Sequence, residues 1–166
     1  MKLLTNHVLR EHVAIGGLAA LLLTPWIGWQ GAMLFWLSNI LIDMDHYLHF
    51  VYAHRGRIFR IREMFQYHQH LFDKVHRSDF LAIEIFHTVE FLALLGWASF
   101  WIWSWLQPIF WGAIFHTVVD FVHLCRHGIP FKRVYSFVEY AIRRNRLKRR
   151  GLAPDWVMTG SDRARR

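Results

Sequence analysis

The sequence has a single cysteine, few acidic residues and two long stretches without any basic residue. Of its 166 residues, 20 are Lys or Arg and only 12 are Asp or Glu. Yet residues 11–54 and 78–125 contain no Lys or Arg at all, and 54% of the chain is hydrophobic. Cys125 has no second cysteine to pair with, which excludes an internal disulfide, and we interpret it as a packed thiol. The separation of charged from apolar stretches is typical of a chain that enters a bilayer.

Several common catalytic motifs are also absent. The sequence contains no GxSxG, no GxxxxGK[ST] and no HExxH, which argues against a serine hydrolase, a nucleotide-binding loop and a zincin-type protease. The net charge of +8 comes from basic residues that flank the apolar stretches. Anionic lipid headgroups attract such flanks, so we expect membrane lipids as partners and no nucleic acid.

Four apolar stretches are each close to the ~20 residues that cross a hydrocarbon core. They run from about Val13 to Trp29, Gly31 to Val51, Phe80 to Trp103 and Ile109 to Cys125. The sequence therefore predicts an all-α polytopic membrane protein, a bundle of four transmembrane helices. We expect residues 1–130 to form this transmembrane domain, and residues 131–166 to form a basic amphipathic helix and a tail.

Basic residues are concentrated in two segments. Residues 54–78 hold six Lys or Arg against two acids, and residues 126–150 hold nine against one. The positive-inside rule places both segments, and both chain termini, in the cytoplasm. Apolar residues recur at helical spacing among these charges, which predicts amphipathic helices along the membrane surface. We favour a membrane anchor over a lipid sensor or a partner dock.

Ionisable residues also occur inside the predicted spans, where no Lys or Arg of the same spans can neutralise them. Carboxyl groups in such surroundings are either protonated or neutralised by a bound cation. The residues are Asp43, Asp45, His46 and His49 in the second span, Glu84, His87 and Glu90 in the third, and His116, Asp120 and His123 in the fourth.

Helical spacing predicts that these side chains converge. His116, Asp120 and His123 are spaced i, i+4 and i+7, which puts them on one stripe of the fourth helix. The three ionisable residues of the third span step by three, so they share one side of its helix. At ~1.5 Å per residue, Asp43, His87 and His116 lie at a similar depth from the cytoplasmic boundary. Three helices are thus expected to contribute to one layer.

Mixed imidazole and carboxylate ligands predict a divalent metal as cofactor. They suit zinc, and also manganese or iron, better than calcium or magnesium. More than four candidates suggest one or two ions, and in a dinuclear centre a metal-bound water would become the nucleophile. His12 and His76 could cap the site from the cytoplasm as further metal ligands, and Asp45 and Glu90 are the predicted acid and base. The other predicted metal ligands are Asp43, His46, His49, His87, His116, Asp120 and His123.

The predicted reaction is hydrolysis of an ester or phosphoester in a lipid or a membrane-associated substrate. Three alternatives stay open: histidines that only form hydrogen bonds between helices, a transporter or channel for divalent cations or protons, and a scaffold that docks a partner through residues 132–150. The outer halves of the four spans are almost wholly apolar, which counts against a continuous transport path.

Two motifs resemble those of a known family, the inner-membrane metal-dependent hydrolases of the YdjM type, which look like membrane-embedded relatives of zinc-dependent phospholipase C and P1 nuclease. The run Asp-Met-Asp-His at residues 43–46 resembles the family's Asp-x-Asp-His. His116 with Asp120 resembles its His-x-x-x-Asp. The resemblance implies a metal-dependent hydrolase of a bacterial inner membrane.

Two further residue groups extend this resemblance over roughly residues 12–123. His12, followed by Gly16, is similar to the family's N-terminal histidine, and His76 with Ser78 is similar to its Thr-His-Ser. The chain departs from the family at Ile42, where a proline is usual. The resemblance leaves the substrate and the oligomeric state open.

Overall fold

The computed structural model describes residues 4–160, and most of them are helical, which confirms the all-α fold class. The chain forms two compact units, each built from two separate segments. Unit 1 comprises Met1–Asp43 and Val89–Pro130, and unit 2 comprises Met44–Thr88 and Phe131–Arg166. Residues 44–88 are thus grouped with the C-terminal part of the chain.

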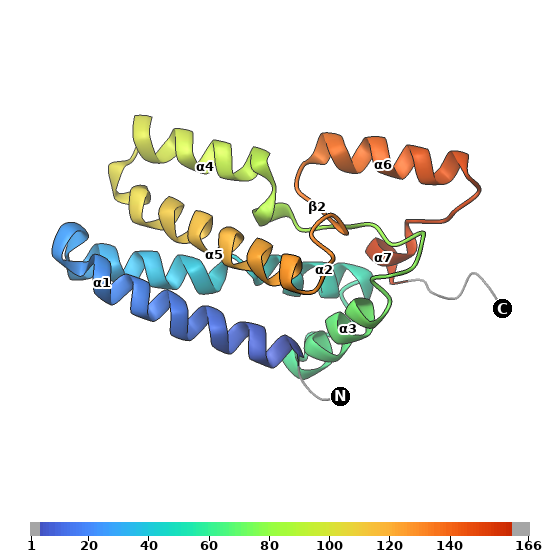
Figure 1. Ribbon diagram of the computed structural model, residues 1–166, viewed down its shortest axis with the longest axis horizontal. Helices are drawn as coiled ribbons and strands as arrows, with labels where there is room; N and C mark the ends of the chain where they lie inside the picture. The colour runs from blue at the N-terminus through green and yellow to red at the C-terminus, as the bar shows by residue number, and fades with distance from the viewer. Residues whose placement is uncertain (1–3, 161–166) are drawn as a thin grey trace. The chain divides into compact units, whose positions relative to one another are not determined.

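The N-terminal helix of unit 1 folds back on itself. α1 (Leu4–Leu41) contains one residue with non-helical backbone angles, Gly28, at φ 67° and ψ 168°. Only glycine adopts this conformation readily. The two legs on either side of Gly28 run antiparallel, as Figure 1 shows, and the indole Nε1 of Trp36 donates a hydrogen bond of 3.0 Å to the carbonyl of Val13. The predicted first span, Val13 to Trp29, and the start of the second, Gly31 to Val51, therefore form a helical hairpin.

A second pair of helices completes unit 1: α4 (Val89–Trp101) and α5 (Gln107–Arg126), joined through a short 3-10 helix, η2 (Ser104–Leu106). α5 packs against α1 at Gly112, where a Cβ would lie only 2.3 Å from the carbonyl oxygen of Phe35. The contact between these helices thus depends on the missing side chain. The apolar core beside it contains Ala20, Ala32 and Phe35, with Leu23, Ile27, Trp36 and Phe115 packed around them.

Two helical stretches are long and apolar enough to cross a membrane, Arg10–Ala53 and Ser104–Arg126. In the most apolar 18-residue window of each, only 17% of the residues are buried. Core helices of soluble proteins are mostly buried, so this exposure favours a lipid environment. The four predicted spans are confirmed only to this extent, because α4 is a shorter apolar helix of 13 residues.

The predicted helix from Phe80 to Trp103 is wrong in its first part. Residues 80–88 form a short strand, β1 (Ala82–Ile83), and a 3-10 turn, η1 (Ile85–His87), before α4 begins at Val89. β1 pairs in parallel with β2 (Arg133–Val134), so its backbone partner lies about fifty residues away. Hydropathy cannot separate a short apolar strand from the start of a helix.

This correction removes one argument about spacing. Glu84 and His87 lie outside α4, whereas Glu90 lies in its first turn, so the three do not share one helical face. The depth predicted for His87 assumed a continuous α-helix from Phe80, so that depth no longer applies.

The predicted second span, Gly31 to Val51, is also interrupted. α1 ends at Leu41 and α2 (Met44–Ala53) begins three residues later, with a turn at residues 42–43 between them. Aspartate competes with the helical backbone for hydrogen bonds and favours such turns. The helix break therefore occurs although Ile42 stands where the family has proline.

Unit 2 contains the basic segments. Its tyrosine Tyr67 and its histidine His49 both contact the carbonyl oxygen of the buried Val157, at 3.1 and 3.0 Å. These contacts attach the C-terminal turn to two helices of the unit. Helices are present in both basic segments, as α3 (Ile61–Asp73) and α6 (Phe137–Arg149) of the four α-helices in the described part of unit 2. Their orientation to a membrane stays a prediction. The other two helices are α2 (Met44–Ala53) and α7 (Trp156–Thr159).

Gly112→Ala should lower the stability of the protein sharply, because the new methyl group would overlap the backbone of Phe35. We expect a loss of about 3 kcal/mol, the upper end of the range for overpacking. The matched control is Gly17→Ala, whose Cβ would approach the Trp36 indole no closer than 3.3 Å. Thermal unfolding in detergent should show a large fall in Tm for Gly112→Ala and little change for Gly17→Ala. Equal effects would contradict the close approach of α5 to α1.

Candidate metal centre

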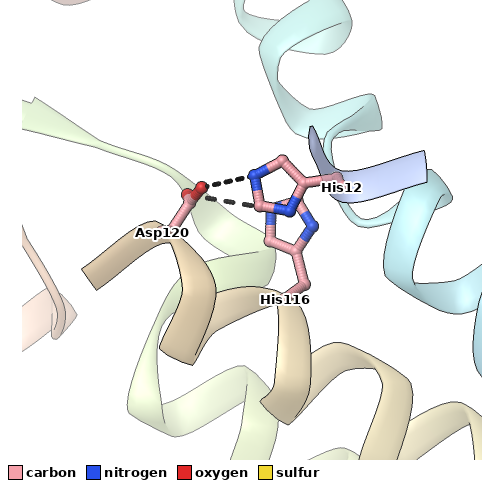
Figure 2. A group of neighbouring side chains, drawn as sticks. All are labelled: His12, His116 and Asp120. Atoms are coloured by element: carbon pink, nitrogen blue, oxygen red, sulfur yellow. Dashed lines mark ion pairs between the residues drawn. The ribbon is translucent and has the colours of Figure 1, made fainter. Parts of the chain in front are cut away.

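Unit 1 brings together four of the predicted metal ligands. The Nε2 atom of His12 lies 3.0 Å from Oδ1 of Asp120, and Nε2 of His116 lies 3.7 Å from Oδ2 of the same carboxylate. Figure 2 shows both imidazoles turned toward Asp120. Nε2 of His116 is also 3.3 Å from Oδ1 of Asp43. The two histidines are almost completely buried, with 1% and 0% of their surface exposed.

The backbone fixes the orientation of the His116 ring. Its Nδ1 lies 2.6 Å from the carbonyl oxygen of Asn39, so Nδ1 carries the proton and Nε2 is the nitrogen directed toward the carboxylates. This arrangement is typical of histidines that bind metals, which donate their other ring N–H to a carbonyl or a carboxylate. The ring also stacks on His12, with 4.0 Å between centroids.

Asn39 connects the two legs of α1 at the level of the histidines. Its side-chain Nδ2 donates a hydrogen bond of 2.9 Å to the carbonyl of His12. A Cβ on Gly16 would lie 2.1 Å from this Nδ2, so only glycine leaves room for the contact. Gly16 thus allows Asn39 to hold both histidines, His12 through its backbone carbonyl and His116 through its ring Nδ1.

The ligand atoms of His12, His116 and Asp120 all lie within 4.8 Å of one another, as a shared metal ion requires, and Asp43 adjoins them through His116; we name these four residues the unit 1 cluster. Ligand atoms ~2.0–2.1 Å from a tetrahedral zinc ion lie ~3.3 Å from one another. The three distances of 3.0, 3.3 and 3.7 Å bracket that value. Nδ1 of His12 is buried and makes no hydrogen bond within residues 4–160.

A second group of ionisable residues lies in unit 2. Nδ1 of the buried His87 is 3.0 Å from Oδ2 of Asp45, and the same oxygen accepts a hydrogen bond of 3.1 Å from the backbone N–H of Phe86. Asp45 therefore orients His87 through Nδ1, which makes Nε2 the nitrogen able to bind a metal. These contacts suit a positioning role for Asp45; the predicted acid or base role remains a prediction.

Glu84 joins this group and is itself neutralised. Its Oε1 lies 3.1 Å from Nδ1 of His46, and its other oxygen forms an ion pair with the buried guanidinium of Arg133. The pairing of β1 with β2 brings Arg133 to this position. Arg133 thus offsets one of the two carboxylates of this group, Asp45 and Glu84.

Further rings surround His46 on α2 and α3. The centroid of His68 lies 4.8 Å from that of His46 and 5.6 Å from that of His49. Nε2 of His68 contacts the carbonyl oxygen of His46 at 2.8 Å. Burial, with the nearby His46 as a smaller cause, lowers the pKa of His68 to about 3, so this ring is neutral at physiological pH.

Three predicted site residues lie apart from the contacts described above. His123 is on α5, but its Nδ1 lies 3.8 Å from Glu11 and its ring packs on His127. His76 is exposed in the turn after α3. Glu90 is half-buried in the first turn of α4. Their predicted roles have no support from this geometry.

Sequence reasoning missed Asn39, Arg133 and His68 as parts of these groups. Asn39 follows His12 by 27 positions and acts partly through its backbone, which leaves no motif. Arg133 was assigned to a surface segment because the strand pairing was not foreseen. His68 lies in the basic segment 54–78, whose charges suggest solvent exposure. Its spacing from Phe65 and Phe72 on an amphipathic helix is the signal that could have indicated a partly buried face.

Comparisons with protein-family models, curated proteins and solved structures find no match for this chain. The likeness to the YdjM-type hydrolases therefore rests on the short motifs alone.

Removing Arg133 should destabilise unit 2, because it leaves the half-buried carboxylate of Glu84 without its counter-charge. Loss of one partner from a buried ion pair costs about 3–5 kcal/mol. We expect Arg133→Met to reduce the free energy of unfolding by an amount in that range. The double variant Glu84→Gln with Arg133→Met should recover part of the loss. Additive losses in chemical unfolding would show that the two side chains do not interact.

Proposed function

We propose that the protein is a membrane-embedded metal-dependent hydrolase whose metal is held by the unit 1 cluster. The observation that carries this proposal is the convergence of two oriented imidazoles on two carboxylates in a part of the chain without Lys or Arg. A positive partner stabilises half-buried carboxylates in apolar surroundings. The backbone contact of His116 favours a metal in that role, because it holds the ring as metal-binding histidines are held.

The donor set favours zinc, with manganese or iron as the next candidates. When bound, such an ion supplies a Lewis acid that polarises a carbonyl or phosphoryl oxygen and activates water. His12 and His116 would hold it as neutral ligands, and Asp43 and Asp120 would supply the compensating charge. Asn39 keeps the two histidines in register.

The membrane part of the proposal rests on the apolar surface of unit 1. Exposed side chains cover both legs of α1, and Leu21, Leu22 and Trp26 are each more than 60% exposed. A soluble monomer rarely exposes such a surface. We infer that both legs, α4 and α5 enter the bilayer, with both chain termini on the cytoplasmic side of an inner membrane, as the basic segments favour.

The substrate class follows from this location. A lipid ester or phosphoester can reach a site among membrane helices from the side, without crossing water. The motifs that resemble the YdjM-type hydrolases include all four residues of the unit 1 cluster, which supports the same reaction class. Glu90 of α4 stays the proposed acid or base within unit 1, although no contact with the cluster is recorded for it.

Metal analysis of detergent-purified protein tests the site directly. We expect about one zinc, manganese or iron ion per chain, and a loss of that ion in His116→Ala and in Asp120→Asn. His76→Ala is the matched control, because this exposed histidine lies in a turn after α3, and it should retain the metal. Circular dichroism should show that all variants are folded. A folded wild-type protein without stoichiometric metal would end the proposal.

Hydrolysis of phospholipids and of soluble phosphoesters, with added zinc or manganese, tests the reaction. Asp120→Asn should reduce the rate by more than the ~10- to 100-fold that follows loss of a residue that only orients a ligand. His76→Ala should keep the wild-type rate. Stoichiometric metal without hydrolysis of any substrate would instead favour the transport alternative, for which metal uptake into vesicles is the assay.

A further inference from the structure

The outer face of α6 combines exposed apolar side chains with unpaired positive charge. At 3.6 residues per turn, five residues fall within roughly 100° of one another around the helix. Two of them, Val138 and Ile142, are 65% and 56% exposed, which is unusual for aliphatic side chains beside a charged segment. The five residues are Val138, Ile142, Asn145, Arg146 and Arg149, and we call them the α6 stripe.

The acidic residues near α6 are used on its other faces. Arg144 and Lys148 both form ion pairs with Asp155, at 2.6 and 2.7 Å, and hold the chain leading to α7. Hydrogen bonding from Arg144 is the largest cause that lowers the pKa of Asp155 to about 2, so this carboxylate stays ionised. Arg143 pairs with Glu139 at 3.1 Å. Within residues 4–160, the acids of α6 and of the chain leading to α7 are therefore engaged with basic residues outside the stripe.

The two arginines of the stripe, Arg146 and Arg149, differ from Arg143 and Arg144 in their contacts. Within residues 4–160 the structure records no ion pair for Arg146 or Arg149. They line a shallow depression of about 320 Å³ together with Ile142 and Asn145. A depression with two guanidinium groups, one amide and one aliphatic wall matches a lipid phosphate with the start of its acyl chain.

Phe131 is a further exposed apolar residue that is tied to α6. Its side chain is 74% exposed, and its carbonyl accepts a hydrogen bond of 3.0 Å from Arg143 of α6. The loop that carries it is therefore tied to the helix. The N-terminus of α6 is fixed as well, because Ser136 accepts hydrogen bonds from the backbone N–H groups of the next turn.

We propose that the α6 stripe and Phe131 dock on an anionic bilayer surface, with Arg146 and Arg149 binding lipid phosphates and the apolar side chains entering the headgroup region. Charge complementarity selects this occupant, because the stripe carries only positive charge and its apolar residues stand beside that charge, as in interfacial helices. The docking extends the proposed function, since it gives unit 2 a lipid contact of its own that needs no metal.

The test uses the full-length protein in nanodiscs, of phosphatidylcholine alone or with added phosphatidylglycerol. Cys125→Ser removes the native thiol, and Val138→Cys carries an environment-sensitive fluorophore on the α6 stripe. In discs with phosphatidylglycerol the probe should be quenched by spin-labelled lipid, and high salt should weaken the quenching. In phosphatidylcholine alone the quenching should be small.

Arg146→Gln with Arg149→Gln is the decisive variant. Each basic residue near an anionic surface strengthens binding about fivefold, so loss of both should shift the docking equilibrium about 25-fold. The matched control, Arg146→Lys with Arg149→Lys, keeps both positive charges at the same positions and should keep most of the docking.

Three outcomes would overturn the proposal. They are quenching that is equal in both lipid mixtures, no quenching in either, and equal losses in the decisive and control variants. Because the probe reports on lipid and the metal assays report on the unit 1 cluster, the docking and the hydrolase proposals can fail independently. Circular dichroism of the Arg146 and Arg149 variant verifies that the protein is folded.

Discussion

The need to neutralise buried carboxylates is the constraint on which the rest of unit 1 depends. Asp120 lies beside two stacked imidazoles, with a ring nitrogen of each within 3.7 Å of its carboxylate. Such close contact requires three helical segments to approach one another without bulky side chains between them. Gly16 provides the space for Asn39 between the legs of α1, and Gly112 lets α5 reach the backbone of Phe35. Helix packing and site geometry are therefore two results of the same small residues.

Much of the architecture could be predicted from the sequence because it follows from the distribution of charge. The hairpin turn near Gly28 lies between two apolar stretches, and α5 occupies nearly the whole of the fourth one. Helical spacing also predicted correctly that His116 and Asp120 are neighbours. It misjudged His123, whose Nδ1 lies toward Glu11 at 3.8 Å and whose ring packs on His127.

The remaining differences have one physical cause, pairing between segments distant in the chain. Residues 80–88 are apolar enough for a membrane helix, yet β1 forms its hydrogen bonds with β2 instead. The same pairing delivers Arg133 to Glu84, so one of the carboxylates predicted to lack a basic partner has one. A hydropathy profile treats each stretch by itself and cannot contain this information. The sequence therefore predicted which residues take part, but it did not predict that they form two separate groups.

The different charge balance of the two groups separates their roles. In unit 2, Arg133 already offsets Glu84, and Asp45 is occupied with orienting His87, so this group can be stable without a further cation. In unit 1 the carboxylates of Asp43 and Asp120 contact His116 and His12, whose imidazoles are neutral unless they bind a proton. A metal ion bound among them would add positive charge while leaving each imidazole neutral, as metal coordination requires. Since Nδ1 of His116 is committed to the carbonyl of Asn39, the ion has a single ring position to occupy, Nε2, and this is the atom that faces both carboxylates.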